Sequence, residues 1–303
     1  MNKLMNNLSL AIIVAGGLVA CGGGGSSNDD SMPLGNGMLS INITDAPIDS
    51  ATEVVVKFDA IEINPQSGEL ITITFSEPKM LDLLSLQNGE TAPLLQDQVL
   101  PAGDYSWIRL MVDADQGEID SYIKFMDGSM FSLYVPSGSN TGLKLNRGFT
   151  IAAGASTNFT LDFDLRKSVH MPMNNADDYF LRPTIRMMDH TEVGAISGYI
   201  LPSVVADASC QAGLSVYAYN NADVAPDDEG SATSPLTSSM PEYDATNDRY
   251  NYSLSYLLAG DYTVAVTCDA DMDDPEVDET EWGYIIKANA LVTINQTTQL
   301  NFE

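Results

Sequence analysis

Leu100-Pro101-Ala102-Gly103-Asp104-Tyr105 is the stretch that decides the fold, because it returns as Leu257-Leu258-Ala259-Gly260-Asp261-Tyr262. Each copy leads directly into a segment rich in strand-forming residues. Glycine permits a tight turn, and the Tyr after it opens the next strand on its buried face. Such a Tyr can donate its hydroxyl to the preceding backbone, as in the tyrosine corner of Greek-key sandwiches. The repeat therefore predicts two similar β-sandwich units; the alternative is an ordinary Gly-Asp turn that occurs twice by chance.

Both predicted units show the period-two alternation of apolar and polar residues that is typical of β-strands. The first unit, residues 38–192, contains about nine such segments, which fits one sandwich. One segment, Lys79 to Leu86, is ambiguous between a strand and a helical turn. The second unit, residues 195–303, contains about seven short segments and an insertion, Asn221 to Asn247, that we interpret as a mobile loop. The fold class that the sequence predicts is all-β, with two sandwich domains in tandem.

The beginning of the chain resembles an export signal followed by a tether. Residues 1–20 carry one Lys and a short apolar run, as in a secretory signal peptide. The run ends in Leu18-Val19-Ala20-Cys21, which looks like a bacterial lipobox and predicts lipidation of Cys21; an ordinary secretory signal is the alternative. Glycine rather than Asp follows Cys21, which favours the bacterial outer membrane. Residues 21–37 are rich in Gly and Ser and are predicted to be a flexible linker.

The chain is strongly acidic, with 42 Asp and Glu against 13 Lys and Arg and a formal net charge of −29. Nucleic acid and anionic lipid surfaces are therefore unlikely partners. The second unit holds only two basic residues, Arg249 and Lys287, so any cationic site is expected in the first unit. Outside the cytoplasm disulfides persist, and we expect Cys210 to pair with Cys268; two free thiols are the alternative.

Several motifs of the first unit occur together in one known family. They are Thr44-Asp45-Ala46-Pro47, the Pro101 to Tyr105 turn with Ile108-Arg109-Leu110, Val135-Pro136-Ser137-Gly138 with Thr141 to Leu145, Asp162-Phe163-Asp164 with Arg166-Lys167-Ser168, and Leu181-Arg182-Pro183. With these motifs, residues 37–190 resemble the bacterial lipoprotein family known as domain of unknown function 4382. The resemblance implies an envelope location and a sandwich fold, and it implies no activity. The second unit is similar to prealbumin-like or carboxypeptidase-regulatory-like modules through its short Gly198-Tyr199-Ile200 and Ser215 to Tyr219 segments.

Strand parity places charged side chains on one face of the first sandwich. The residues are Arg109, Asp162, Asp164, Arg182 and Arg186. If their strands are neighbours, they form a ladder of ion pairs or, alternatively, a groove for an anion or a glycan. The glycine-containing turn Thr141 to Lys144 is a second, weaker candidate for anion binding, since it is also explained as a simple connection.

The second unit offers two further candidate sites. Alternating acidic residues after Cys268 resemble the start of a calcium loop, and the candidate ligands are Asp269, Asp271, Asp273 and Asp274. A solvated acidic loop is the alternative, because Asp274 stands where an EF-hand needs Gly. Tyr250, Tyr252 and Tyr256 share one strand face, and we interpret them as core residues rather than as a glycan-stacking platform.

The sequence contains no catalytic motif that would indicate an enzyme. The chain lacks Gly-x-Ser-x-Gly and a P-loop and contains only His170 and His190. We therefore expect a membrane-anchored envelope lipoprotein with a non-catalytic binding, adhesive or structural role, without a cofactor apart from calcium, and with a glycan or an envelope protein as partner. The alternative is a calcium-dependent enzyme, for example a glycosidase, that acts on envelope or extracellular polymer.

The lipidation hypothesis predicts the outcome of one substitution. Cys21→Ser removes the only acyl acceptor of the lipobox, so the variant is expected to fractionate as a soluble periplasmic protein, while the wild type fractionates with membranes. Cell fractionation without detergent measures the difference. A variant that stays with the membranes contradicts the hypothesis.

Overall fold

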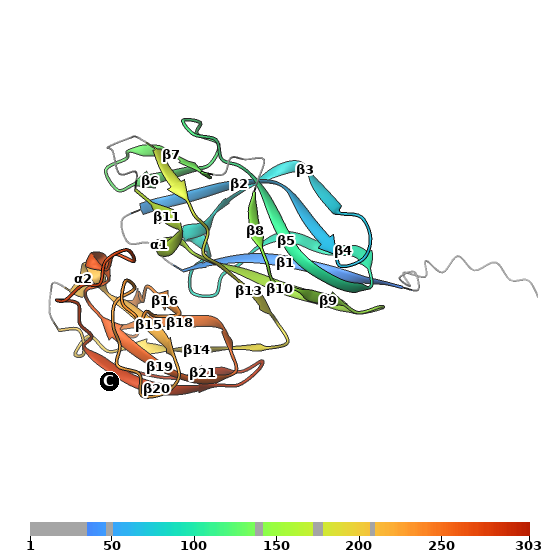
Figure 1. Cartoon of the computed structure of the whole chain (residues 1–303). Coiled ribbons are helices and arrows are strands. Elements are labelled where there is room, and N and C mark those ends of the chain that lie inside the picture. Colours follow the sequence, from blue (N-terminus) through green and yellow to red (C-terminus); the bar gives the residue numbers. More distant parts are fainter. Residues whose placement is uncertain (1–34, 47–50, 137–141, 172–177, 207–209) are drawn as a thin grey trace, which may run out of the picture. The chain divides into compact units, whose positions relative to one another are not determined.

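The computed structural model describes residues 35–46, 51–136, 142–171, 178–206 and 210–303. Cys21 and most of the linker lie outside these residues. The chain is all-β, as predicted, and its strands form four sheets (Figure 1). Among the described residues, no helix is long and apolar enough to span a membrane.

The first sandwich consists of a four-stranded sheet with the order β13-β10-β1-β4 and a nine-stranded sheet with the path β11-β12-β7-β6-β2-β5-β8, to which β3 and β9 are added through β2 and β5. The strands are β1 (Asn36–Ala46), β2 (Ala51–Pro65), β3 (Ile71–Asp82), β4 (Ala92–Pro101), β5 (Gly103–Asp113), β6 (Tyr122–Phe125), β7 (Met130–Tyr134), β8 (Leu143–Leu145), β9 (Phe149–Ile151), β10 (Ser156–Asp164), β11 (Val169–His170), β12 (Asp178–Leu181) and β13 (Ile185–Asp189). A 3₁₀ turn, η1 (Leu83–Leu86), and a short helix, α1 (Leu165–Ser168), interrupt them.

Alternating apolar residues of the two sheets meet in one core. Ile41 and Phe163 from the four-stranded sheet and Phe58 and Ile61 from the larger sheet are fully buried. The rings of Phe58 and Phe163 pack edge to face, with centroids 6.4 Å apart, so they join the two sheets directly.

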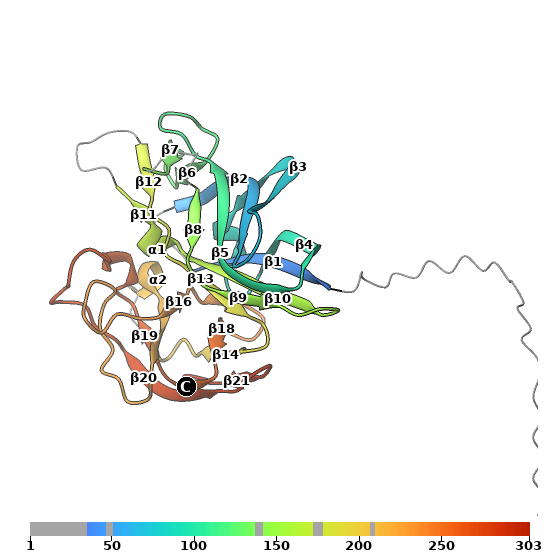
Figure 2. The ribbon, with the colours of Figure 1, turned by 45° about the vertical axis from the view of Figure 1, so that its right-hand side comes forward.

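The second sandwich pairs two four-stranded sheets, with the orders β17-β18-β14-β21 and β16-β15-β19-β20 (Figure 2). The strands are β14 (Val193–Ile200), β15 (Ser215–Asn220), β16 (Thr237–Ser239), β17 (Glu242–Asp244), β18 (Arg249–Leu258), β19 (Gly260–Thr267), β20 (Ile286–Val292) and β21 (Thr297–Gln299), with the short helices α2 (Cys210–Gly213) and η2 (Ala270–Met272). Ile196 and Leu254 from one sheet and Val216 and Val264 from the other are buried in a common core.

Both predicted tyrosine corners are present. The Tyr105 hydroxyl donates to the Pro101 carbonyl at 2.6 Å, and the Tyr262 hydroxyl donates to the Leu258 carbonyl at 2.9 Å. In each repeat the glycine of the turn has a positive φ, 152° and 157°, which a side chain would strain. The duplicated stretch therefore performs the same task in both sandwiches, and chance recurrence does not explain it.

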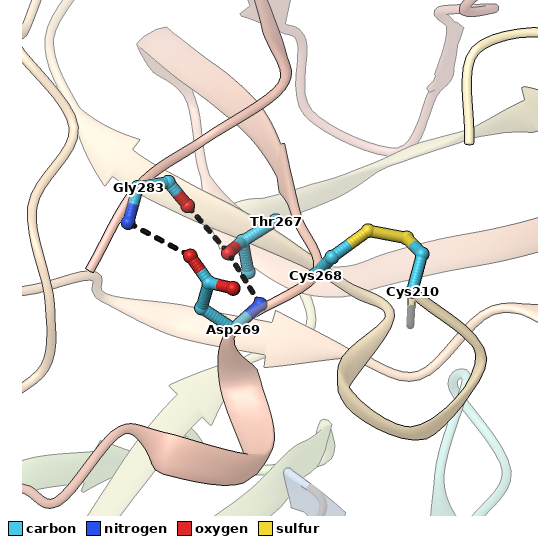
Figure 3. The surroundings of a disulfide bond; sticks show 5 residues. All are labelled: Cys210, Thr267, Cys268, Asp269 and Gly283. Atoms are coloured by element: carbon cyan, nitrogen blue, oxygen red, sulfur yellow. Dashed lines mark hydrogen bonds between the residues drawn. A yellow bond between two sulfur atoms is a disulfide. The ribbon is translucent and has the colours of Figure 1, made fainter. Parts of the chain in front are cut away.

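Cys210 and Cys268 form the predicted disulfide, which joins α2 to the end of β19 (Figure 3). The bond closes a loop with a sequence separation of 58, worth about 4 kcal/mol in the chain-entropy model. Next to it, the Gly283 amide donates to Asp269 Oδ2 at 3.1 Å, and the Thr267 hydroxyl donates to the Gly283 carbonyl at 2.6 Å. The disulfide and these hydrogen bonds hold both ends of the acidic loop.

The structure resolves one ambiguous segment and corrects one expectation. Lys79 to Leu86 contains both a strand and a helical turn, since β3 continues to Asp82 and η1 follows. The insertion Asn221 to Asn247 is not merely a loop, because β16 pairs with β15 and the side chains of Asp228 and Glu229 are buried. Its polar composition reflects buried carboxylates with specific partners rather than a lack of structure.

The corners predict the effect of two substitutions. Tyr105→Phe and Tyr262→Phe each leave a backbone carbonyl without its phenol donor, so each is expected to lower the free energy of unfolding by about 1 kcal/mol. Tyr243→Phe is the control, because the Tyr243 hydroxyl bonds Asp248 in a ring that is 53% exposed. Urea denaturation compares the three variants, and equal midpoints for all of them contradict a stabilising role for the corners.

Candidate functional site

Part of the predicted charged face exists as an ion pair between a buried Asp and a half-buried Arg. Asp162 on β10 and Arg186 on β13 are directly opposite each other in the four-stranded sheet, and Arg186 Nη2 donates to Asp162 Oδ2. Burial raises the pKa of the Asp162 carboxyl, while Arg186 opposes the rise. The pair is thus a structural element of the sheet.

The other three residues do not join it, so the predicted five-residue ladder is wrong. Arg109 lies on β5 in the other sheet, where its Nη1 donates to Glu62 at 2.9 Å. Asp164 caps α1 by accepting from the Lys167 amide at 3.2 Å, and Arg182 follows β12 with its guanidinium 4.9 Å from the Phe180 ring centre. Side-chain parity gives the face of each strand but does not determine which strands are neighbours.

A buried cation, Arg166 of α1, connects the two sandwiches. Its Nη1 donates to the Tyr217 hydroxyl at 2.6 Å and to Glu229 Oε1 at 3.0 Å, and the Tyr217 hydroxyl donates to Asp273 Oδ2 at 2.7 Å. The side chains of Arg166 and Glu229 are only 5% and 3% exposed. Burial raises the pKa of Glu229 to about 7, against the opposing effect of Arg166. We call these four residues the Arg166 junction.

The four predicted calcium ligands are separated in the structure. Asp269 Oδ2 accepts from the Gly283 amide, Asp274 Oδ1 accepts from the Glu276 amide, and Asp271 is exposed. Only Asp273 takes part in a cluster of carboxylates, and its neighbours there are two residues that we did not predict together.

These neighbours are Asp228 from the insertion and Glu279 from the far end of the acidic loop. One carboxylate oxygen of each of Asp228, Asp273 and Glu279 lies within 4.8 Å of the others, and this is the only such group of metal-ligating side chains among the described residues. We call this cluster the carboxylate centre. The alternating Asp pattern pointed to the correct loop but to the wrong ligands, since Asp228 is remote in sequence.

The first sandwich contains a pocket that is lined by cations, with a volume of about 570 Å³. Its polar lining includes four basic or imidazole side chains, and the remainder is largely apolar. The lining residues are Val135, Pro136, Gly142, Leu143, Lys144, Lys167, His170, Leu181, Arg182, Pro183 and Thr184. They come from the ends of β7 and β12, from β8 and from the α1–β11 segment. This volume lies in the range of small-ligand sites.

Two cations of this cationic pocket have no carboxylate partner among the described residues. Lys144 Nζ lies 4.5 Å from the ring centre of Trp107, and the Arg182 guanidinium lies over Phe180. By contrast, Lys167 Nζ is 3.4 Å from Asp164 Oδ2, and His170 Nδ1 is 3.0 Å from Glu276 Oε1. Aromatic faces therefore hold Lys144 and Arg182 while leaving their positive charge available to a ligand.

Lys144 closes the Thr141 to Lys144 turn that we considered for anion binding. Thr141 itself lies outside the described residues, and in the described part Gly142, Leu143 and Lys144 all line the pocket. The sequence motifs Gly142-Leu143-Lys144 and Leu181-Arg182-Pro183 thus meet at one place. The only sequence signal that these two motifs are neighbours was that both occur in the motif set of the same family.

Two tyrosines of β18 belong to the core of the second sandwich. Tyr252 is 3% exposed and donates its hydroxyl to the Leu300 carbonyl at 2.7 Å, and the half-buried Tyr250 packs against the same core. Tyr256 is also half-buried, but it has a positive φ of 56°, and its ring centre lies 5.8 Å from that of His190. The interpretation as core therefore holds for Tyr250 and Tyr252, whereas Tyr256 packs outside this core.

The four sheets described above define the chain as a β-sandwich protein. Residues 36–183 match the family model described as "Domain of unknown function (DUF4382)", which confirms the predicted family relationship of this part of the chain. The lipoprotein character of the chain stays a prediction. No curated protein matches the chain in sequence.

Several solved structures show low-level similarity to this chain. The Bacillus anthracis TIE protein is 11% identical, with 88% of this chain and 34% of that chain covered and a TM-score of 0.20, so the chain spans about one third of its length. GBS52, the minor pilin of Streptococcus agalactiae, is 12% identical, with 87% of this chain and 94% of that chain covered and a TM-score of 0.20. A fimbrial protein from Bacteroides ovatus is 9% identical, with 90% of this chain and 49% of that chain covered and a TM-score of 0.22.

The Arg166 junction predicts a large effect of a single substitution. Arg166→Met leaves the Glu229 carboxylate buried without its main cation, so the free energy of unfolding is expected to fall by about 3–5 kcal/mol. Adding Glu229→Gln removes the uncompensated charge and is expected to restore part of the loss. Arg249→Met is the control, because its side chain is 34% exposed and its Nε is 3.8 Å from Asp244 Oδ2. Chemical denaturation measures all three, and a loss no larger than that of Arg249→Met contradicts the junction's importance.

Proposed function

We propose that the protein is a non-catalytic, lipid-anchored envelope protein that binds an acidic polysaccharide in the cationic pocket. The observation that carries this proposal is the pair of cations, Lys144 and Arg182, which line one pocket and have no carboxylate partner among the described residues, in a chain of net charge −29. In a chain so rich in carboxylates, cations that are held by aromatic rings instead are well suited to a ligand's own carboxylates.

The surroundings of the pocket fit a sugar polymer better than a small ion. Trp107 is half-buried, and both Lys144 Nζ, at 4.5 Å, and the Arg109 guanidinium, at 4.9 Å, lie over its ring. The pocket also has apolar walls from Val135, Leu143 and Pro183. A combination of apolar surface and a few charged groups can hold a sugar ring while it pairs with the carboxylate.

The described histidines lend no support to catalysis. His190 Nε2 is 2.7 Å from the Thr160 hydroxyl, which is the geometry of a base beside a nucleophile. Thr160, however, is fully buried in β10, so a substrate cannot reach its oxygen. The other histidine, His170, is bound to Glu276 at the rim of the pocket. Binding without turnover is therefore the function that we infer.

The test compares two ligands that differ only in charge. Polygalacturonate is expected to bind the full chain, and its methyl ester is expected not to, since the ester keeps the sugar backbone and removes the carboxylates. Added salt should weaken binding of the acid, because it screens the ion pairs. Isothermal titration measures affinity, and release of reducing ends measures turnover.

The variant Lys144→Ala/Arg182→Ala is expected to lose at least about tenfold in affinity, which corresponds to about 1.4 kcal/mol. The control is Lys79→Ala/Lys287→Ala, which removes the same charge from two lysines that also lie over aromatic rings, those of Phe75 and Tyr284. Equal losses in both double variants would show that net charge alone attracts the polymer. Release of reducing ends by the wild type would replace the binding role with an enzymatic one.

A further inference from the structure

The carboxylate centre brings together two distant parts of the second sandwich. Asp228 comes from the insertion, whereas Asp273 and Glu279 come from the acidic loop after η2. Asp228 is fully buried and Asp273 is 7% exposed. Three carboxylates at such short range repel one another strongly unless a cation or protons lie between them.

Two of the oxygens in this cluster are buried and have no hydrogen-bond donor among the described residues. They are Asp228 Oδ1 and Glu279 Oε2. The second oxygen of each group is held, since Asp228 Oδ2 accepts from the Glu279 amide and Glu279 Oε1 accepts from the Asp274 amide, both at 3.1 Å. Each carboxylate is thus fixed by one oxygen and keeps the other unsatisfied. A buried acceptor of this kind requires a partner, because its desolvation is otherwise uncompensated.

We propose that Asp228, Asp273 and Glu279 bind a calcium ion. Calcium takes oxygen ligands at 2.3–2.6 Å, so two ligands of one ion are at most about 5 Å apart, and the three oxygens satisfy this limit at 4.8 Å. The cluster offers no His or Cys, which zinc prefers. Magnesium demands a near-ideal octahedron and keeps most of its water, so a mostly buried set of three carboxylates suits it less well.

The ion would act on the Arg166 junction through Asp273. Asp273 Oδ2 accepts from the Tyr217 hydroxyl, and its Oδ1 accepts from the Glu229 amide at 2.9 Å. Tyr217 and Glu229 both accept hydrogen bonds from Arg166 of the first sandwich. Calcium at the carboxylate centre therefore fixes the side chains that join the sandwiches, so its binding is coupled to the stability of the junction.

The experiment uses the full chain after treatment with a chelator. Calcium chloride is expected to bind in isothermal titration and to raise the melting temperature more than sodium chloride of equal ionic strength. In the double variant Asp228→Asn/Glu279→Gln, each side chain keeps the oxygen that accepts a backbone hydrogen bond. The oxygen without a donor is replaced by an amide nitrogen. This variant is expected to bind calcium more weakly by on the order of a hundredfold. Its calcium-free melting temperature is expected to equal or exceed that of the wild type, because repulsion is relieved.

The control variant is Asp271→Asn/Asp278→Asn, which removes the same charge from exposed positions of the same loop. It should keep the calcium affinity of the wild type. A second readout uses terbium, a hard cation that can replace calcium and emits when a nearby indole transfers energy to it. The Trp282 ring stacks on Tyr217 with centroids 5.7 Å apart, so Trp282→Phe should abolish the emission that is excited through tryptophan, whereas Trp107→Phe should leave it.

Several results overturn the proposal. They are an equal melting shift in calcium and in matched sodium, an unchanged affinity in Asp228→Asn/Glu279→Gln, and a loss of affinity in the control variant as large as in the test variant. Terbium emission that depends on Trp107 rather than on Trp282 places the ion elsewhere. Equal affinity for magnesium rejects calcium as the selected ion.

Discussion

A guanidinium that is buried between two sandwiches constrains most of the structure around it. Arg166 has lost its water, so it needs acceptors that are already in place, and a missing partner is very costly. Two of its acceptors come from the second sandwich, Tyr217 from β15 and Glu229 from the insertion. These contacts cross from one sandwich to the other, and residues 32–303 form one compact unit. The charge therefore selects one arrangement of the two halves from among those that apolar contact alone permits.

Local features of this fold could be predicted from the sequence because they depend on neighbouring residues. The tyrosine corners need only a Gly with positive φ and a Tyr whose hydroxyl returns four residues, so the motif and its repeat were sufficient. The disulfide was predicted from two cysteines and from the expected location of the chain outside the cytoplasm. Strand periodicity gave the all-β class and placed Asp162 and Arg186 on faces that could meet.

The binding sites depend on which distant segments become neighbours, and periodicity does not contain that information. Asp228 in the insertion carries no sign that it meets Asp273 and Glu279, and a polar insertion resembles a mobile loop until its buried partners are known. Likewise, Lys144 and Arg182 were separate family motifs, and Arg109 was assigned to the wrong group because β5 belongs to the opposite sheet. In an acidic chain, the informative feature is which charges lack a counter-charge, and only the structure shows this.

The position of β1 has a mechanical consequence for a tethered protein. β1 is the first described strand and lies inside its sheet, parallel to β10 on one side and antiparallel to β4 on the other. Tension from a membrane anchor would enter through Asn36 and act along the strand. Nine residue pairs with β10, from Met38↔Ser156 to Ala46↔Asp164, would then bear the load together in shear instead of opening one after another. A sandwich built in this way resists being pulled apart from its N-terminal end.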